Sequence, residues 1–170
     1  MAQSVQLAPP PALEAAPMPS DLCWLLSRAS YILTTKLTAA LQDLGVSPRA
    51  HCVLSAAMSG DHTQTELARM VGLDKTTMVV TLDELESAGL AERRPSPSDR
   101  RARVIAVTKA GERKVREAET IANSIREDVL AVLTPQDREV FLDSLSLLVT
   151  KPLSEPSPCA QPVRRRAPRR

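Results

Sequence analysis

The sequence has very few aromatic residues: one Trp, one Tyr and one Phe among 170 residues. Because 43% of the residues are nonetheless apolar, Leu, Val and Ala must fill the core, as is typical of helical proteins. Long apolar runs are also missing, since no run of apolar residues approaches the roughly 18 residues that indicate a membrane span. The first basic residue is Arg28, so the N-terminal stretch lacks the pattern of a signal peptide. We therefore expect a mainly helical protein that does not act at a membrane.

Cysteine and histidine are scarce as well. The three cysteines, Cys23, Cys52 and Cys159, are odd in number and lack metal-ligand spacing, which argues against a disulfide framework. A reduced, cytoplasmic protein is the simplest interpretation. His51 and His62 fall in different predicted elements, so we expect no metal site and no cofactor. Enzyme motifs such as a nucleophile elbow or a phosphate-binding loop are missing, and we do not expect catalytic activity.

The formal net charge of +2 conceals an uneven distribution. Residues 1–19 are rich in Ala and Pro and carry one acidic side chain, which predicts a disordered N-terminal arm. Residues 151–170 contain five prolines, six basic side chains and one acidic one, which predicts a disordered tail rich in Pro and Arg. This tail is either a non-specific DNA clamp that acts through counterion release or a solvated segment without function.

Six helices are predicted between residues 20 and 150 from the spacing of apolar residues and from start and stop signals. A first helix is expected over residues 21–44. A second begins after Ser47, where a proline follows an N-cap residue, and contains Cys52 as an expected core residue. A third starts at the capping-box pair Thr63 and Glu66. The other helices are expected after caps at Asp74, Thr108 and Thr134, and reach about Ala88, Leu133 and Val149.

The third and fourth predicted helices form a helix-turn-helix, with Gly72 in the turn between them. Residues 90–94 and 103–107 are predicted as short strands, since a proline-rich loop separates them. A hairpin directly after a recognition helix is a wing, so the expected fold is mainly α with a small β-hairpin wing. The winged helix-turn-helix DNA-binding domain is expected over residues 47–107, and a helical dimerisation region over residues 20–46 and 108–150.

A specific motif covers residues 99–111. Asp99 and Arg101 precede an apolar strand, and Thr108 is followed three residues later by Gly111. The motif resembles that of the MarR family of winged helix-turn-helix regulators, which have Asp-x-Arg, a strand, and then Leu-Thr-x-x-Gly. This chain departs from the pattern only in Val107, where Leu is usual. Residues 82–86 and 88–90 also resemble the family, and the resemblance extends over roughly residues 22–149.

Arginines flank the proposed wing tip, namely Arg93, Arg94, Arg100, Arg101 and Arg103. Such a cluster suits DNA, because cations contact phosphates and the weakly hydrated guanidinium enters a narrow minor groove at little cost. The resemblance implies that Arg101 enters the minor groove and that Asp99 pairs with it or braces the loop. The alternative interpretation is a solvated charge run.

The expected recognition helix supplies a second set of candidates for DNA binding, namely Lys75, Thr76, Thr77, Val80 and Thr81. The amine of Lys75 would reach a phosphate or a guanine edge, and hydroxyl and methyl groups would contact phosphates or bases. Many family members have Thr-Arg where this chain has Val79 and Val80, so we expect the wing to contribute more of the binding. Ordinary capping is the alternative for Thr76 and Thr77, and core packing is preferred for Val79.

The predicted function is a sequence-specific transcriptional regulator, of the repressor type, that binds double-stranded DNA as a homodimer. The resemblance implies an inverted-repeat operator with half-sites about one helical turn apart. It also implies release by a small aromatic ligand or by thiol oxidation. Cys23, in the first turn of the first helix, is the candidate redox sensor, and a buried structural thiol is the alternative. The competing function is a winged-helix protein-interaction module without specific DNA readout.

Overall fold

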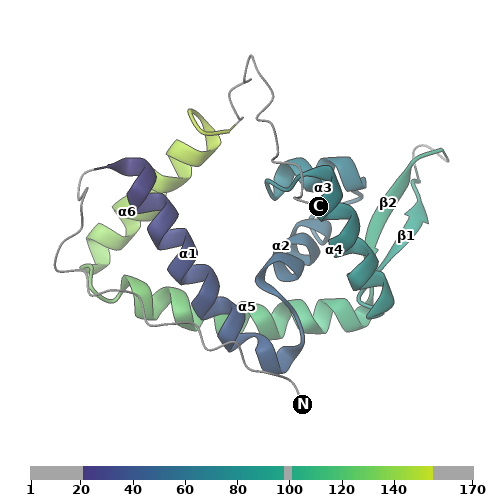
Figure 1. Cartoon of the computed structure of the whole chain (residues 1–170), viewed down its shortest axis with the longest axis horizontal. Helices are drawn as coiled ribbons and strands as arrows, with labels where there is room; N and C mark the ends of the chain where they lie inside the picture. Colours follow the sequence, from purple (N-terminus) through teal and green to yellow (C-terminus); the bar gives the residue numbers. More distant parts are fainter. Residues whose placement is uncertain (1–20, 98–100, 155–170) are drawn as a thin grey trace, which may run out of the picture. The chain divides into compact units, whose positions relative to one another are not determined.

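The computed structural model describes residues 21–97 and 101–154, which are mainly helical with one two-stranded antiparallel hairpin (Figure 1). This architecture confirms the expected fold class. The chain divides into two compact units, Met1–Ile125 and Arg126–Arg170. The elements are α1 (Leu22–Ala40), the 3-10 helix η2 (Gln42–Leu44), α2 (Pro48–Ala57), α3 (Gln64–Met70), α4 (Lys75–Ser87), β1 (Ala91–Pro95), β2 (Arg103–Val107), α5 (Lys109–Leu130) and α6 (Pro135–Thr150).

Side-chain caps explain where the helices begin. The Ser47 hydroxyl accepts the backbone N–H of Ala50 at 3.1 Å at the start of α2. Thr63 and Glu66 form the predicted capping box, in which the backbone N–H of Thr63 donates to the Glu66 carboxylate at 2.7 Å. Because the backbone and hydroxyl of Thr63 both bond this carboxylate, the pKa of Glu66 is lowered. Thr134 caps α6, as its position before a proline predicts.

Two helices end earlier in the sequence than predicted. The first helix consists of two pieces, because α1 ends at Ala40 and a single 3-10 turn then leads to Gly45, whose φ of 68° is left-handed. Leu41 is only 1% exposed at the join, so the chain turns around a buried side chain there. The long helix α5 ends at Leu130, not at Leu133. The helical spacing of apolar residues continues past both helix ends, so this spacing could not indicate where the helices stop.

The core of the first unit lies among α2, α3, α4, the hairpin and the start of α5. Leu54, Leu67 and Leu82 come from three different helices and are each 0% exposed. Ile105 of β2 and Val115 of α5 belong to the same cluster. Complete burial of a side chain of this size contributes on the order of 2 kcal/mol. This shared core fixes the positions of α4 and the hairpin.

Strand β2 is hydrogen-bonded along both of its edges, by β1 on one side and by the loop before α3 on the other. β1 and β2 pair over their full length, with Ala91 opposite Val107. On the outer edge of β2, the backbone N–H of Ile105 donates to the carbonyl of His62 at 2.9 Å. The loop that precedes α3 therefore acts as a short third pairing partner. Figure 1 shows the two strands extending away from the helices.

Thr108 and Gly111 join the hairpin to the end of α4. The Thr108 hydroxyl donates to the carbonyl of Gly89 at 2.7 Å, and the Thr108 N–H donates to the carbonyl of Leu90 at 3.0 Å. A Cβ atom on Gly111 would lie 2.1 Å from the Leu90 carbonyl oxygen and 2.7 Å from a Val107 methyl group. Only glycine fits there, so the Thr-x-x-Gly pattern has a steric reason.

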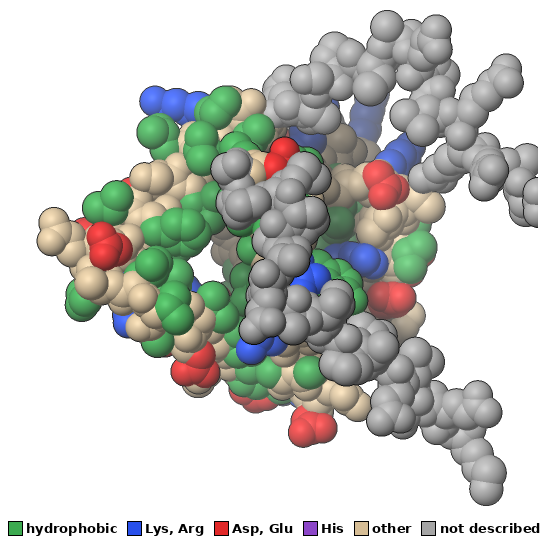
Figure 2. Space-filling model, turned by 60° about the vertical axis from the view of Figure 1, so that its left-hand side comes forward, with side chains coloured by type: hydrophobic (Ala, Val, Ile, Leu, Met, Phe, Trp, Pro, Cys, Tyr) green, Lys and Arg blue, Asp and Glu red, His purple; other side chains and the backbone are tan. Residues whose placement is uncertain are grey.

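The helices α1 and α6 leave many of their apolar side chains exposed and the others only half-buried. Of the described residues in these two helices, none is buried. The large exposed apolar side chains are Leu22, Leu25, Tyr31 and Leu33 in α1, and Val140, Phe141, Leu142, Leu147 and Val149 in α6. Hydrophobic side chains reach the surface at many points of the face drawn in Figure 2. Among the described residues, no helix has the length and hydropathy needed to span a membrane.

Candidate nucleic-acid interface

The N-terminus of α4 is positioned by Asp74. One carboxylate oxygen of Asp74 accepts the backbone N–H groups of Thr76 and Thr77, each at 3.0 Å, and the other accepts the Thr77 hydroxyl at 2.6 Å. Thr77 is thus used in the cap, which was the alternative interpretation of this residue. Lys75, Thr76 and Val80 are exposed on the first turns of α4, and Val80 is 50% exposed. These three side chains form the accessible part of the predicted helix site.

Thr81 does not belong to that exposed surface, and its prediction as a DNA contact was wrong. The residue is 1% exposed, and its hydroxyl donates to the carbonyl of Thr77 at 2.8 Å. The reason is helical spacing: Thr81 lies three residues after Met78 and four before Leu85, so it shares their buried face. The hydroxyl suggested a surface position, but bonding to the preceding turn satisfies it within the helix.

The described wing arginines differ in exposure and in the direction that they face. Arg94 is exposed and pairs with Glu92 of its own strand. Arg101 and Arg103 are exposed near the end of the hairpin. Arg93 instead turns toward α4, where carboxylates hold it. Asp99 and Arg100 lie outside the described residues.

Two acidic residues that bind Arg93 were missed by the sequence analysis. The guanidinium of Arg93 forms ion pairs with Asp83, at 2.8 Å, and with Glu86, both on α4. The Glu86 carboxylate also accepts the backbone N–H of Arg93 at 2.9 Å. Their spacing of three residues was a usable signal, because it places both carboxylates on one face of the helix. Nothing local indicated that this face would meet β1.

A second cluster lies on α2, outside the predicted DNA-binding set. The Nε2 atom of His51 and the Oγ atom of Ser55 are both buried, and neither has a hydrogen-bond partner among the described residues. They are four residues apart, so they lie on the same side of the helix. Burial lowers the pKa of His51, although the nearby Glu119 carboxylate partly opposes this. Buried polar atoms without partners are uncommon in proteins and mark a place where a ligand or water can bond.

The two described cysteines are both exposed. Cys23 lies in the first turn of α1, where the sequence analysis placed its candidate sensor, and its side chain is exposed in the single chain. Cys52 was expected in the core but is exposed, because Val53 and Leu54 form the inward face of α2. Partial desolvation nevertheless raises the pKa of the Cys52 thiol, which disfavours its reactive thiolate form.

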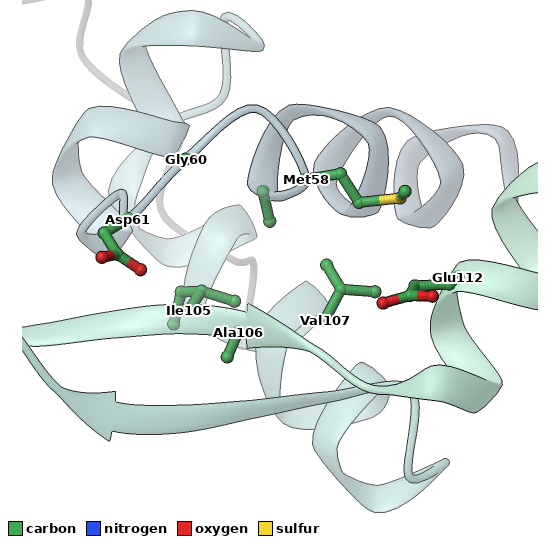
Figure 3. A pocket seen from close by; sticks show the side chains of 8 residues that line it. Met58, Gly60, Asp61, Ile105, Ala106, Val107 and Glu112 are labelled. Atoms are coloured by element: carbon green, nitrogen blue, oxygen red, sulfur yellow. The ribbon is translucent and has the colours of Figure 1, made fainter.

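A pocket of about 390 Å³ lies between the end of α2 and strand β2. Figure 3 shows Val107 pointing from the strand toward the helix end that carries Met58, with Asp61 and Glu112 on opposite sides. The described residues that line it include these two carboxylates but no Lys or Arg. An anionic ligand would therefore meet only like charge from ionised side chains here. None of the predicted site residues lines this pocket.

A helix-turn-helix whose second helix leads into an arginine-bearing hairpin defines a winged helix-turn-helix protein. Residues 44–102 match the MarR family. The transcriptional regulator PA3341 is 30% identical over 79% of this chain and 100% of its own, with a TM-score of 0.70. The MarR family protein Rv2887 of Mycobacterium tuberculosis, solved with salicylic acid, is 30% identical over 76% of this chain and 96% of its own, with a TM-score of 0.62. This chain belongs to the MarR family of transcriptional regulators.

A third relative has been solved in two liganded states. The transcriptional repressor CouR of Rhodococcus jostii RHA1, bound to a 23-mer DNA duplex, is 26% identical over 81% of this chain and 99% of its own, with a TM-score of 0.72. CouR bound to p-coumaroyl-CoA is 28% identical over 82% of this chain and 96% of its own, with a TM-score of 0.69. The predicted family is thus confirmed.

Proposed function

We propose that this chain is a cytoplasmic repressor without catalytic activity, which binds operator DNA as a homodimer and is released by an effector. The observation that carries the proposal is the exposed start of α4 beside an arginine-bearing wing, both fixed to one core. A helix of this kind enters the major groove, and wing arginines reach phosphates or the minor groove. The DNA-bound structure of CouR supports the same use of the fold.

In this arrangement the two elements have different tasks. Lys75 and Thr76 supply donors at the start of α4, and the exposed methyl groups of Val80 suit contact with a thymine methyl group. Arg101 and Arg103 supply positive charge from the wing. Because α4 offers no arginine in its exposed first turns, charge-based affinity comes mainly from the wing.

The homodimer is supported by the apolar side chains that α1 and α6 expose. Single exposed apolar residues are ordinary, but two helices without one buried described residue need a covering surface. A second copy of the chain provides that surface by two-fold symmetry. The symmetric dimer then presents two copies of α4 to an inverted repeat whose half-sites are about one helical turn apart.

DNA binding is tested by fluorescence anisotropy on labelled duplexes from the region upstream of the gene, at several salt concentrations. Replacing Arg101 with Ala should weaken binding and lower the slope of log K against log salt by about 1, because one phosphate contact is lost. Arg126→Ala is the matched control, since this arginine lies in the other unit. Footprinting should show two protected half-sites. An Arg101→Ala protein that binds as tightly as the wild type would remove the wing from the mechanism.

The effector is proposed to bind at His51 and Ser55 on α2. Both polar atoms are buried without partners, so a phenol or carboxylate on a small aromatic ligand would gain two hydrogen bonds there. Structures of Rv2887 with salicylic acid and of CouR with p-coumaroyl-CoA support a ligand of this class. The pocket beside Asp61 and Glu112 is less suited to an anion because it is acidic.

A titration of the protein–DNA complex with salicylate tests this site. His51→Ala and Ser55→Ala should keep DNA binding but need a higher ligand concentration for release, whereas Asp61→Asn should respond as the wild type does. If the Asp61 variant alone changes the response, the ligand binds in the other pocket and the assignment to His51 is wrong.

Thiol oxidation is the second proposed route of release, and it rests on the exposed position of Cys23 in the first turn of α1. An organic hydroperoxide should dissociate the wild-type complex, and Cys23→Ser should prevent this. Cys52→Ser is the control, because the raised pKa of Cys52 makes that thiol a poor nucleophile. Equal release of the Cys23→Ser complex would exclude this route.

A further inference from the structure

Arg93 is held between the wing and the recognition helix. Its side chain starts on β1, is 30% exposed, and bonds two carboxylates of α4. The Nη2 atom lies 2.8 Å from Asp83, and Nη1 bonds Glu86, whose other oxygen accepts the Arg93 backbone N–H at 2.9 Å. Three bonds therefore connect one residue of the wing to two positions of the helix.

The charges in this cluster oppose a direct role in DNA binding. Carboxylates on a recognition helix repel phosphates, so Asp83 and Glu86 alone would weaken the complex. With two acids around one guanidinium, the cluster carries a formal charge of about −1 and leaves Arg93 no free positive charge to offer a phosphate. Its strand neighbour Arg94 differs, since it is exposed on the opposite face of β1 and pairs with Glu92.

We infer that Arg93 is a positioning residue, which Asp83 and Glu86 hold so that the wing keeps a fixed distance and angle from α4. This inference rests on the proposed DNA-binding function. Strand pairing links Arg93 to the tip of the wing. Arg93 lies opposite Ile105 on β2, and two positions nearer the tip Pro95 lies opposite Arg103. Loosening the cluster would let Arg101 and Arg103 move relative to Lys75 on α4. A protein that must engage two grooves at once loses affinity when their spacing becomes variable.

Neutralising the acids separates positioning from simple charge. If Glu86 only adds negative charge near DNA, then Glu86→Gln should bind more tightly than the wild type. If it holds Arg93, the same change should weaken binding by about tenfold, since charge-assisted bonds are lost. Glu84→Gln is the matched control, because Glu84 is an exposed acid on the same helix, and its affinity should stay equal or rise slightly.

The guanidinium itself is tested with conservative and neutral replacements. Arg93→Lys keeps the charge but cannot bond both carboxylates in a fork, so it should lose affinity to about the same extent as Glu86→Gln. Arg126→Lys, in the other unit, is its control and should change little. Arg93→Gln should weaken binding while leaving the slope of log K against log salt unchanged, whereas Arg101→Ala reduces that slope. The double variant Arg93→Gln/Glu86→Gln should be no weaker than the worse single variant.

Hydrogen exchange without DNA provides a readout that is independent of the proposed function. In Glu86→Gln, the amides of residues 91–94 and 103–107 should exchange faster than in the wild type, while amides of α2 and α3 should not. Loss of DNA binding by the wild type would refute the proposed function alone, and the exchange result would still decide the role of Arg93. Tighter DNA binding by Glu86→Gln, unchanged exchange in the hairpin, or a reduced salt slope for Arg93→Gln would overturn the inference.

Discussion

The winged-helix part of the chain buries its apolar side chains, whereas the outer helices α1 and α6 leave many of theirs exposed. Residues of α2, α3, α4 and the hairpin bury one another in a closed cluster. The described residues of α1 and α6 include none that is buried. The first region can therefore hold its own geometry, whereas the second leaves apolar side chains exposed, which the proposed dimer would cover. This difference fits a protein whose DNA-reading surface is preformed and whose pairing surface is completed on assembly.

The largest effect on stability is expected inside the closed cluster. Leu82→Ala removes a side chain that is 0% exposed, so it should reduce the free energy of unfolding by about 2 to 5 kcal/mol. Urea unfolding followed by circular dichroism measures this loss. Leu147→Ala, at a position of α6 that is 53% exposed, is the matched comparison and should cost clearly less at low protein concentration. If both variants lost the same free energy of unfolding, the proposed difference between the two regions would be wrong.

Gly111→Ala should be nearly as damaging as the loss of a core leucine. The added Cβ would meet the Leu90 carbonyl oxygen at 2.1 Å, and neither backbone can move without disturbing the join between α4, β1 and α5. We expect a loss of about 3 kcal/mol in thermal or urea unfolding. Gly45→Ala is the control, since a Cβ there meets nothing within 4 Å and only the φ of 68° opposes it. Its cost should be about 1 kcal/mol.

A charge placed on α6 tests whether the outer helices pair. Phe141→Asp should raise the dimer dissociation constant by more than about tenfold, because a buried interface cannot solvate an unpaired carboxylate. Sedimentation velocity measures the dissociation constant. Asp143→Asn, which removes an exposed charge from the same helix, is the control. A wild-type protein that stays monomeric at high concentration would contradict the proposed dimer.

The cap of the recognition helix should have a moderate effect. Asp74→Ala leaves the backbone N–H groups of Thr76 and Thr77 without their acceptor, and should cost about 1 kcal/mol of stability. Asp74→Ser, which can still cap, should recover most of this loss. Urea unfolding of the three proteins is the measurement, and an unchanged midpoint for Asp74→Ala would show that α4 does not depend on its cap.

The smallest expected effect is a pH dependence from His51. Its folded pKa lies below the ordinary value of 6.5, since burial disfavours the charged ring. The unfolded chain therefore binds this proton more readily, so the contribution of His51 to stability is present above pH 6.5 and is lost as pH falls below it. Urea midpoints at about pH 7.5 and about pH 5.5 should differ less in His51→Gln than in the wild type. Equal differences in both proteins would contradict this assignment.

The candidate site was predictable only in part. Lys75, Thr76 and Val80 are exposed as expected, since helical periodicity separates them from Met78 and Leu82. The same periodicity places Thr81 on the buried face of α4. Its polar side chain suggested an exposed position, and the prediction was therefore wrong.

The unpartnered atoms on α2 and the carboxylates around Arg93 were not predictable. Each depends on which helix face meets a distant element, and spacing within one segment carries no information about that meeting. His51 was one of two isolated histidines in the sequence, and Glu86 was one of several acids on a helix.

Local sequence patterns were enough to predict the order of the elements and where each of them starts. Caps such as Ser47, Thr63 and Thr134, and the glycine that fits beside Leu90, act within a few residues, so their physics is visible in the local pattern. That Arg93 faces α4 and that Cys52 is exposed became visible only in the folded chain. Burial and ion pairing depend on how segments far apart in the chain pack together. This packing turns Arg93 toward α4 and leaves Arg94, Arg101 and Arg103 exposed.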